Sequence, residues 1–288
     1  MFRFKEFSVH NSGVAMKVGT DGVLLGAVMS LDASSRELLD IGTGTGVVSL
    51  LAAQRLSELG ADSFRITAID IDGPSARVAS LNFSESPWAD KLRAVPESLE
   101  DFSAGSGAGV VFDSIFSNPP YYDESLGNED RRVNAARHTG SLSYREICEF
   151  AADRLKCGGR LSLVLPSSCE KTLRRTAASY GLKASRIVRV RTTARKEPLR
   201  IVAEFVKTEA LHVKTEALHV KTEALHVKAE APHVKAEAPH TKGEAQLVEE
   251  EIVLSEPNVT DKYYLYEKDY NHIDSAGGGA ACSNGADA

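Results

Sequence analysis

The chain has 288 residues, 42% of them hydrophobic, and a formal net charge of −6. This length suits one domain of about 200 residues with additions. No apolar run approaches the roughly 20 residues of a membrane span, and the first residues lack the apolar region of a signal peptide. The cysteines Cys148, Cys157, Cys169 and Cys282 form no CxxC motif. We therefore expect a cytoplasmic protein with reduced thiols, the first three buried, and no metal site.

Short apolar runs alternate with helical patterns along most of the chain. After an N-terminal cap, residues 1–35, strands are predicted at 38–41, 66–70, 92–95, 110–116 and 161–166, and helices at 45–59, 74–83, 144–156 and 169–180. Residues 184–191 and 199–205 follow without a helix between them, so they are expected to form an antiparallel hairpin at one edge. The alternation predicts an α/β, Rossmann-like fold with a mostly parallel, doubly wound sheet.

A glycine-rich loop, Asp40–Gly46, follows the first predicted strand and opens a helix. Glycines let the backbone approach a ligand closely, and the helix N-terminus offers N–H groups to an anionic group. The loop differs from the GxGxxG fingerprint because its third glycine comes one position early. The second strand ends at Asp70, whose carboxylate can bind both hydroxyls of a ribose. The alternative for Asp70 is a helix N-cap, although Asp72, just ahead of Pro74, suits that role better.

A second motif, Ser117-Asn118-Pro119-Pro120-Tyr121, closes the strand at 110–116. The Asn118 side chain and the Pro119 carbonyl can accept both hydrogens of one NH2 group, because the prolines hold the turn rigid. The Tyr121 ring can stack on a flat substrate. For the motif alone, the less favoured alternative is a rigid surface turn. Since ligands bind at the carboxyl ends of parallel strands, we expect both motifs and Asp70 to surround one cleft.

These motifs together resemble class I S-adenosylmethionine-dependent methyltransferases that act on amino groups. Residues 16–26, 136–138, 142–147 and 263–270 sharpen the resemblance to one bacterial family, the tRNA1(Val) (adenine-37-N6)-methyltransferases. The resemblance covers residues 1–206 and 249–270. It implies a seven-stranded sheet whose last strand is inserted antiparallel. It also implies S-adenosylmethionine as cofactor and the anticodon loop of valine tRNA as the partner whose adenine receives the methyl group.

The resemblance also implies roles for individual residues. The catalytic residues would be Asn118, Pro119 and Tyr121. The cofactor would be bound by the glycine loop and its neighbours, namely Asp40, Gly42, Gly44, Gly46, Asp70 and Ser98, with Lys17, Thr20 and Asp21 beside the pocket. Arg137 and His138 would contact substrate phosphates, the alternative being ordinary surface residues.

Charge is distributed unevenly along the sequence. Residues 1–206 carry a net charge of +1, and the remainder carries −7. Within residues 171–200 ten basic side chains are opposed in the sequence by Glu197 alone. Such clustering favours a contact with an RNA backbone, which we expect from Arg189, Arg191, Arg195 and Lys196 near the hairpin loop. A solvated surface that aids solubility is the alternative.

Residues 207–248 consist of six heptapeptides, the first three being identical copies of Lys-Thr-Glu-Ala-Leu-His-Val. A coiled coil is disfavoured because alanine fills half of its seam and Pro232 and Pro239 interrupt it. The recurring histidines are not taken as a metal site. We predict a disordered or partly helical insertion. Residues 249–270 would return as a strand and helix that complete the core, and 271–288 would form a disordered tail.

Three other functions share parts of this pattern. A release-factor-type protein glutamine-N5 methyltransferase also uses Asn-Pro-Pro-Tyr. That class usually carries a separate N-terminal helical domain, and only 35 residues precede the first predicted strand here, which counts against it. An rRNA guanine-N2 methyltransferase commonly carries a duplicated domain, and none is visible. A nucleic-acid-binding module that has lost catalysis is disfavoured by intact Asp40, Asp70, Asn118 and Tyr121. We expect the protein to act as a monomer.

Overall fold

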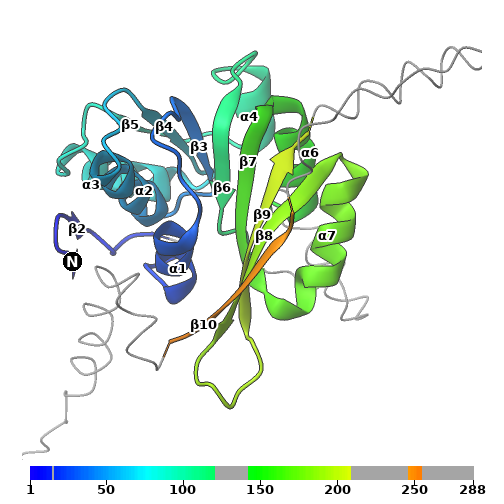
Figure 1. Ribbon diagram of the computed structural model, residues 1–288. Coiled ribbons are helices and arrows are strands. Elements are labelled where there is room, and N and C mark those ends of the chain that lie inside the picture. The colour runs from blue at the N-terminus through cyan, green and yellow to red at the C-terminus, as the bar shows by residue number, and fades with distance from the viewer. Residues whose placement is uncertain (15, 121–141, 209–245, 255–288) are drawn as a thin grey trace, which may run out of the picture.

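The computed structural model describes residues 1–14, 16–120, 142–208 and 246–254. They form a central sheet with helices on both faces (Figure 1). The helices are α1 (Thr20–Val28), α2 (Val47–Glu58), α3 (Gly73–Ser84), α4 (Leu99–Ala104), α6 (Tyr144–Arg154) and α7 (Glu170–Ser179), with a 3-10 turn, η1 (Ser167–Cys169). The strands are β1 (Phe2–Arg3), β2 (Ser8–Val9), β3 (Glu37–Ile41), β4 (Arg65–Ile69), β5 (Leu92–Val95), β6 (Phe112–Ser117), β7 (Leu155–Pro166), β8 (Leu182–Arg191), β9 (Arg200–Lys207) and β10 (Val248–Val253).

The main sheet has eight strands in the order β10-β8-β9-β7-β6-β3-β4-β5. Strand β9 is antiparallel to both of its neighbours, and the other described pairings in this sheet are parallel. The predicted Rossmann-like sheet with its antiparallel insertion is therefore confirmed. The sheet has one strand more than the expected seven, because β10 pairs in parallel with β8 at its edge. The hairpin of β8 and β9 consequently does not form the edge.

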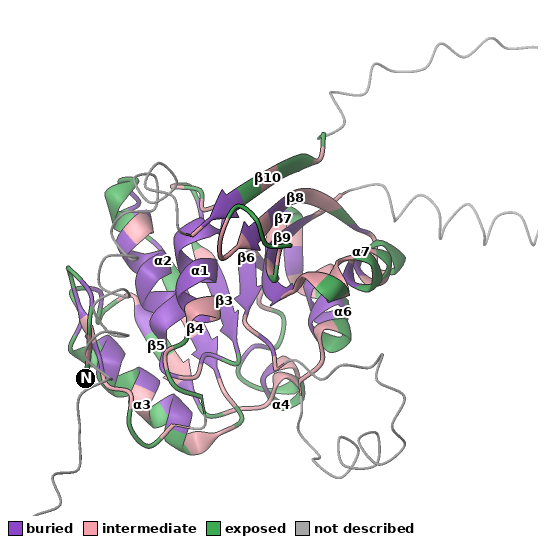
Figure 2. Ribbon diagram, turned by 90° about the horizontal axis from the view of Figure 1, so that it is seen from below, coloured by how far each residue is buried: buried purple, intermediate pink, exposed green. Residues whose placement is uncertain are grey.

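Alternating apolar residues give the sheet a hydrophobic core on each face. Leu38 of β3 packs in the core that α1, α2 and α3 cover. Its neighbour Leu39 packs in the core beneath α4, α6 and α7. This alternation follows from the twofold side-chain period of a strand. Figure 2 shows the buried strands between the two helical layers.

The described fold departs from the sequence expectations in a few places. Helices α1 and α4 and the small sheet of β1 and β2 lie in segments for which no element was predicted. Helix α6 ends at Arg154, because residues from Leu155 onward already belong to β7. Cys148 is buried as expected, but Cys157, near the start of β7, is exposed and Cys169 is only half-buried.

Several expectations concern residues outside the described ranges. These are the contacts of Tyr121, Arg137 and His138, the heptapeptide segment from residue 209 to 245, and everything after Leu254. Among the described residues, no helix is long and apolar enough to cross a membrane. No group of three or more His, Cys, Asp or Glu side chains there is arranged to hold a metal ion.

Candidate active site

The site lies where three parallel strands end side by side. Ile41 of β3 is in register with Ile69 of β4 and with Ser117 of β6. The next residue of each strand is therefore Gly42, Asp70 or Asn118, at one edge of the sheet. The sequence thus brings together residues that are far apart along the chain, as expected for a crevice outside the carboxyl ends of the strands.

The glycine loop has a backbone that other residues adopt only with strain. Gly42, Gly44 and Gly46 have φ values of 72°, 58° and 81°. Gly46 also leaves no room for a side chain, because an added Cβ would lie 2.5 Å from the Phe83 ring. Gly46 directly precedes α2, whose first turn has no side-chain cap. The N–H groups at that end are consequently left to other acceptors, which suits the carboxylate of a ligand.

Asp70 is tied to this loop by backbone hydrogen bonds. Its Oδ2 accepts from Gly44 N–H at 2.8 Å, and its Oδ1 accepts from Asp72 N–H at 2.9 Å. Each carboxylate oxygen retains capacity for a further donor, such as a ribose hydroxyl. Partial burial raises the pKa of Asp70. Asp72 is the actual N-cap of α3, since its Oδ2 accepts from Ser75 N–H at 2.9 Å.

Asp40 supports the loop from behind. It is 1% exposed, and its Oδ2 accepts from the hydroxyls of Thr43 and Ser49, each at 2.7 Å. Burial raises the pKa of Asp40 to about 6, against the effect of these two hydroxyls and with a smaller upward contribution from Asp70. Asp40 is absent from the described cavity lining. Its position is that of a residue that shapes the loop and the start of α2.

The Asn-Pro-Pro turn is fixed to the neighbouring strand. The Ser117 hydroxyl donates to the Ile41 carbonyl at 2.6 Å, which joins the ends of β6 and β3. Asn118 and Pro120 line the cavity, whereas Pro119 is buried. The turn therefore presents the Asn118 amide to the same space that Gly42 and Asp70 face.

The cavity has a volume of about 490 Å³, within the range of ligand sites. Of the predicted site residues it is lined by Lys17, Gly42, Gly44, Asp70, Ser98 and Asn118. Gly46, Thr20 and Asp21 lie outside this lining. Ser98 also caps α4, accepting from Asp101 N–H at 3.0 Å. Further residues of the lining were not predicted from the sequence, and examples are Gly22, Ile71, Leu142 and Glu146.

One of these missed residues had a sequence signal. Ser143 and Glu146 form a capping box, in which the Ser143 hydroxyl and N–H contact Glu146 and the Glu146 N–H contacts Ser143. The Ser-x-x-Glu spacing predicts such a helix start. It places Glu146 in the first turn of α6, at the mouth of the cavity. Gly22 and Ile71 carry no comparable local signal.

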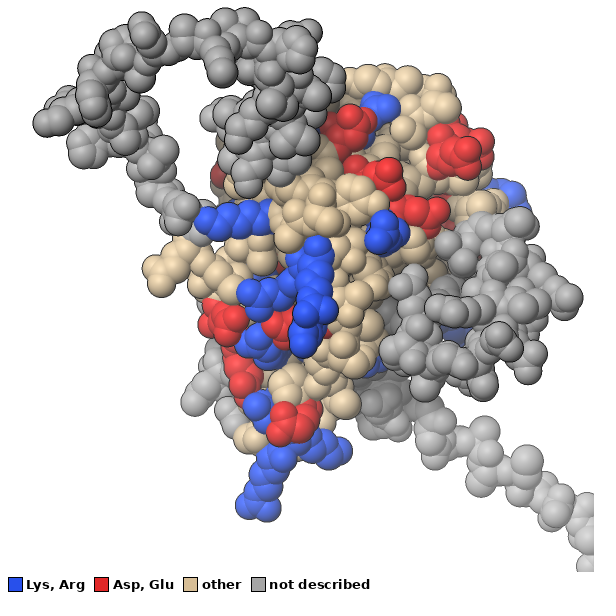
Figure 3. Space-filling model, turned by 90° about the vertical axis from the view of Figure 1, so that its right-hand side faces the viewer, with Lys and Arg blue, Asp and Glu red and all other residues tan. Residues whose placement is uncertain are grey.

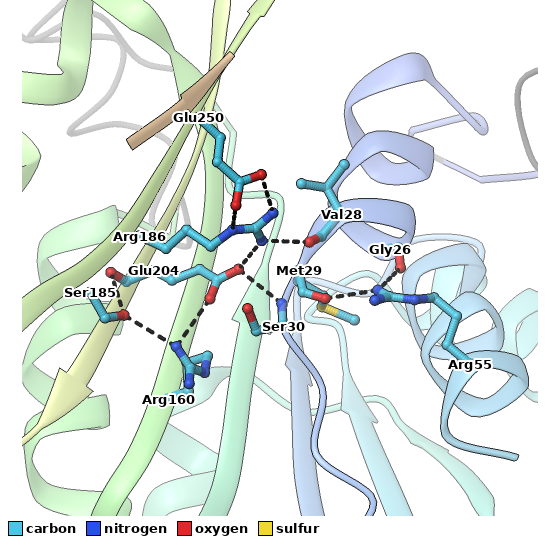
Figure 4. Close-up of polar contacts among 10 residues, drawn as sticks. All are labelled: Gly26, Val28, Met29, Ser30, Arg55, Arg160, Ser185, Arg186, Glu204 and Glu250. Carbon is cyan, nitrogen blue, oxygen red and sulfur yellow. Dashed lines mark hydrogen bonds and ion pairs between the residues drawn. The ribbon is translucent and has the colours of Figure 1, made fainter. Parts of the chain in front are cut away.

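Helix α1 forms one wall, through Gly22, and is held at both ends. At its start Asp21 accepts from Arg200 Nε at 2.9 and 3.0 Å. At its end the carbonyls of Gly26 and Met29 accept from Arg55, and that of Val28 accepts from Arg186, each at 2.8 Å (Figure 4). Arginines at a helix C-terminus complement the helix dipole.

A buried carboxylate connects this end of α1 to the far strands. Glu204 is 0% exposed and accepts from Ser30 N–H at 2.8 Å, from Arg186 at 2.9 Å and from Arg160 at 3.2 Å (Figure 4). Arg186 also donates to both oxygens of Glu250 on β10. The wall of the cavity is thus linked to the strand that follows the heptapeptide segment.

Two predicted RNA-binding arginines have acidic partners. Arg189 donates to Glu170 at 2.6 and 3.0 Å and to Glu249 at 3.2 Å. Arg191 forms an ion pair with Glu251. The inference that Glu197 alone opposes the basic segment is wrong, because β10 brings three consecutive glutamates against it from beyond the insertion. In contrast, Arg195 and Lys196 are exposed in the loop after β8.

Comparison with known proteins agrees with this geometry. The model of the methyltransferase small domain family matches residues 12–183. The fold and site thus define a class I, S-adenosylmethionine-dependent methyltransferase. A Bacteroides fragilis protein named tRNA1(Val) (adenine(37)-N6)-methyltransferase is 39% identical over 204 residues, which cover 71% of this chain and 83% of that relative. Relatives of the same name from Porphyromonas gingivalis and Mannheimia succiniciproducens are 40% and 37% identical, covering 80% and 81% of their lengths and 71% and 72% of this chain. The chain belongs to this methyltransferase family.

Solved structures confirm the fold class at greater evolutionary distance. A methyltransferase from Pyrococcus furiosus aligns with a TM-score of 0.50 at 19% identity, covering 70% of this chain and 89% of its own. A predicted O-methyltransferase from Agrobacterium tumefaciens aligns with a TM-score of 0.54 at 15% identity, covering 86% and 97%. At such identities the likeness concerns the fold alone.

Proposed function

We propose that this enzyme transfers a methyl group from S-adenosylmethionine to N6 of adenine 37 in the anticodon loop of valine tRNA. The observation that carries the proposal is the Asn118 turn, which shares one cavity with Asp70 and the glycine loop. The shared name of the relatives supports the choice of tRNA and of the adenine. The enzyme would act as a cytoplasmic monomer.

The residues present suit S-adenosylmethionine, which supplies an activated methyl group when bound. Asp70 offers two carboxylate oxygens to ribose hydroxyls. Gly42 and Gly44 allow the backbone to approach the ligand, and the uncapped start of α2 suits its carboxylate. Ser98 and Leu99 line the part of the cavity beyond Asp70, where we expect the cofactor's adenine. Asp40 would act indirectly, by holding the loop.

Asn118 would make the substrate amine reactive. The N6 lone pair of adenine is delocalised into the ring, so the free amine is a poor nucleophile. Acceptors at Asn118 Oδ1 and the Pro119 carbonyl would bind both N6 hydrogens and favour the pyramidal, positively charging nitrogen of the transition state. The remaining contribution is alignment of the nitrogen with the methyl group. Tyr121 would stack on a base turned out of the anticodon loop.

Methyl transfer from labelled S-adenosylmethionine tests this proposal. The substrates are bulk tRNA that lacks the modification and, separately, purified release factor. We expect label in tRNA, recovered as N6-methyladenosine. Label in release factor would instead indicate a protein glutamine methyltransferase. Binding of tRNA without transfer to either substrate would indicate a binding module.

A further inference from the structure

The basic residues of the segment 171–200 fall into two groups in the structure. In one group, Arg186, Arg189 and Arg191 form ion pairs with Glu250, Glu249 and Glu251 of β10, and the first two also pair with Glu204 and Glu170. Arg174 and Arg200 pair with Glu170 and Asp21. Five other cations of this segment, Lys171, Arg175, Lys183, Arg195 and Lys196, are exposed, and none forms an ion pair with a carboxylate of the described residues. Lys183 lies near the start of β8, at the edge of the sheet opposite the active site. In Figure 3, which views the side of α7, basic and acidic side chains lie interleaved.

Lys171, Arg175, Arg195 and Lys196, which have no acidic partner among the described residues, lie at the same edge of the sheet as the active site. Strand β7 ends at Pro166, which is in register with Arg200 at the start of β9. The loop between β8 and β9, which carries Arg195 and Lys196, therefore lies beside η1, at the carboxyl end of β7. Hydrogen bonds confirm the contact, since Ser167 N–H and Oγ donate to the carbonyls of Leu199 and Pro198.

Lys171 and Arg175 extend this surface onto α7. They are four residues apart, so they lie on one face of the helix. They line a hollow of about 430 Å³ together with Ser167, Ser168, Glu170 and Arg174. The Glu170 carboxylate repels an anion there only weakly, because it forms ion pairs with Arg189 and Arg174.

The distance to the cavity suits an RNA loop. Asn118 directly follows β6, and β7 is the next strand in the sheet, with β9 on the other side of β7. With strands about 4.8 Å apart, the basic surface begins one to three strands from the Asn118 turn, or roughly 5–15 Å. A nucleotide whose base enters the cavity would have its neighbouring phosphates within this reach.

We propose that Lys171, Arg175, Arg195 and Lys196 form the surface that binds the phosphate backbone of the tRNA substrate, while Arg189 and Arg191 instead fasten β10 to the sheet. This inference rests on the proposed function. Lys171 and Arg175 thus take the place of Arg189 and Arg191, which the sequence had indicated. The reason is that a cation already paired with carboxylates gains little by binding phosphate. Release of counterions by the four proposed cations would supply the affinity.

The test compares two variants by the salt dependence of binding to unmodified valine tRNA. One variant carries Ala at the four proposed positions, and the matched control carries Ala at Arg189 and Arg191. For the fourfold variant we expect affinity to fall about tenfold to a hundredfold near 0.1 M salt, with a salt slope lower by about 3. Its affinity for S-adenosylhomocysteine should be unchanged, which shows that it folds. The control should keep the salt slope of the wild type but unfold at a lower temperature.

Two results would overturn the inference. The first is a wild-type salt slope in the fourfold variant together with a reduced slope in the control. It would show that Arg189 and Arg191 of β8 bind the RNA instead. If the wild-type enzyme methylates valine tRNA, this outcome leaves the proposed function intact. If the wild-type enzyme neither binds nor methylates tRNA, the proposed function fails and the RNA surface fails with it.

Discussion

At the scale of single residues, the site separates groups that face the cavity from groups that shape it. Asn118 and Asp70 line the cavity, while Asp40 lies behind the loop with its carboxylate bonded to Thr43 and Ser49. Replacing residues of the two kinds should therefore have different effects, on the reaction in one case and on stability in the other.

We expect Asn118→Ala to lower kcat by about a hundredfold or more, because a fixed polar partner of the transition state is lost. Affinity for S-adenosylhomocysteine, measured by calorimetry, should stay within about twofold of the wild type, since Asp70 and the loop are intact. A variant with wild-type kcat would exclude Asn118 from the chemistry.

Asp40→Asn should change how stability depends on pH. The pKa of Asp40 is raised by burial to about 6, so the folded protein keeps a proton that the unfolded chain has already released. The stability contributed by this group is full below the unfolded pKa and is lost as pH rises through 6. The free energy of unfolding of the wild type minus that of Asp40→Asn should fall by about 2 kcal/mol from about pH 4.5 to about pH 7. Urea titrations without cofactor measure these free energies at each pH. A difference between wild type and variant that does not change with pH would contradict the buried position of Asp40.

At the scale of elements, the sequence predicted those whose pattern is local. The strands that end at Ile41, Ile69 and Ser117 were predicted within a few residues, because each is a short apolar run followed by a polar turn. Helix α1 was missed, since its seven consecutive buried residues include two glycines and show no amphipathic face. The pairing of β10 with β8 could not be foreseen either, because it depends on residues separated by the insertion.

The contact between α1 and α2 depends on Gly26. A Cβ added there would lie 2.6 Å from Leu51 Cδ1 and 2.7 Å from Leu51 Cβ. We expect Gly26→Ala to lower the free energy of unfolding by about 1–2 kcal/mol, since overpacking outweighs the better helix propensity of alanine. In a Leu51→Gly background, which also removes the Leu51 Cβ, the same change should be neutral or stabilising. Additive losses in the double variant, measured by denaturant unfolding, would show that the two residues do not meet.

At the scale of the whole molecule, the heptapeptide segment joins two ends that lie near each other. Strand β9 ends at Lys207, level with Leu182 at the edge of the sheet opposite the active site, and β10 begins at Val248, level with Arg186 four residues further along β8. Two strand spacings and a short offset along the sheet separate them, roughly 15 Å in all. The segment is therefore a candidate for an insertion that the fold does not require.

We predict that replacing residues 209–245 by a linker of about eight Gly and Ser residues leaves the fold and the methyl transfer rate unchanged, because such a linker spans about 27 Å when extended. A matched variant that ends at residue 208 also lacks β10 and should lose stability, since Arg186, Arg189 and Arg191 would lose their partners on that strand. Loss of activity in the linker variant alone would show that the segment takes part in function.

The proposed activity of the cavity at the Asn118 turn is methylation of one adenine of one tRNA. The most direct measurement is digestion and mass spectrometry of an unmodified valine tRNA transcript after incubation with enzyme and S-adenosylmethionine, beside a transcript with guanine at position 37. We predict a single methyl group on N6 of adenine 37 in the first transcript and none in the second. Methylation at another nucleotide, or equal methylation of both transcripts, would contradict it.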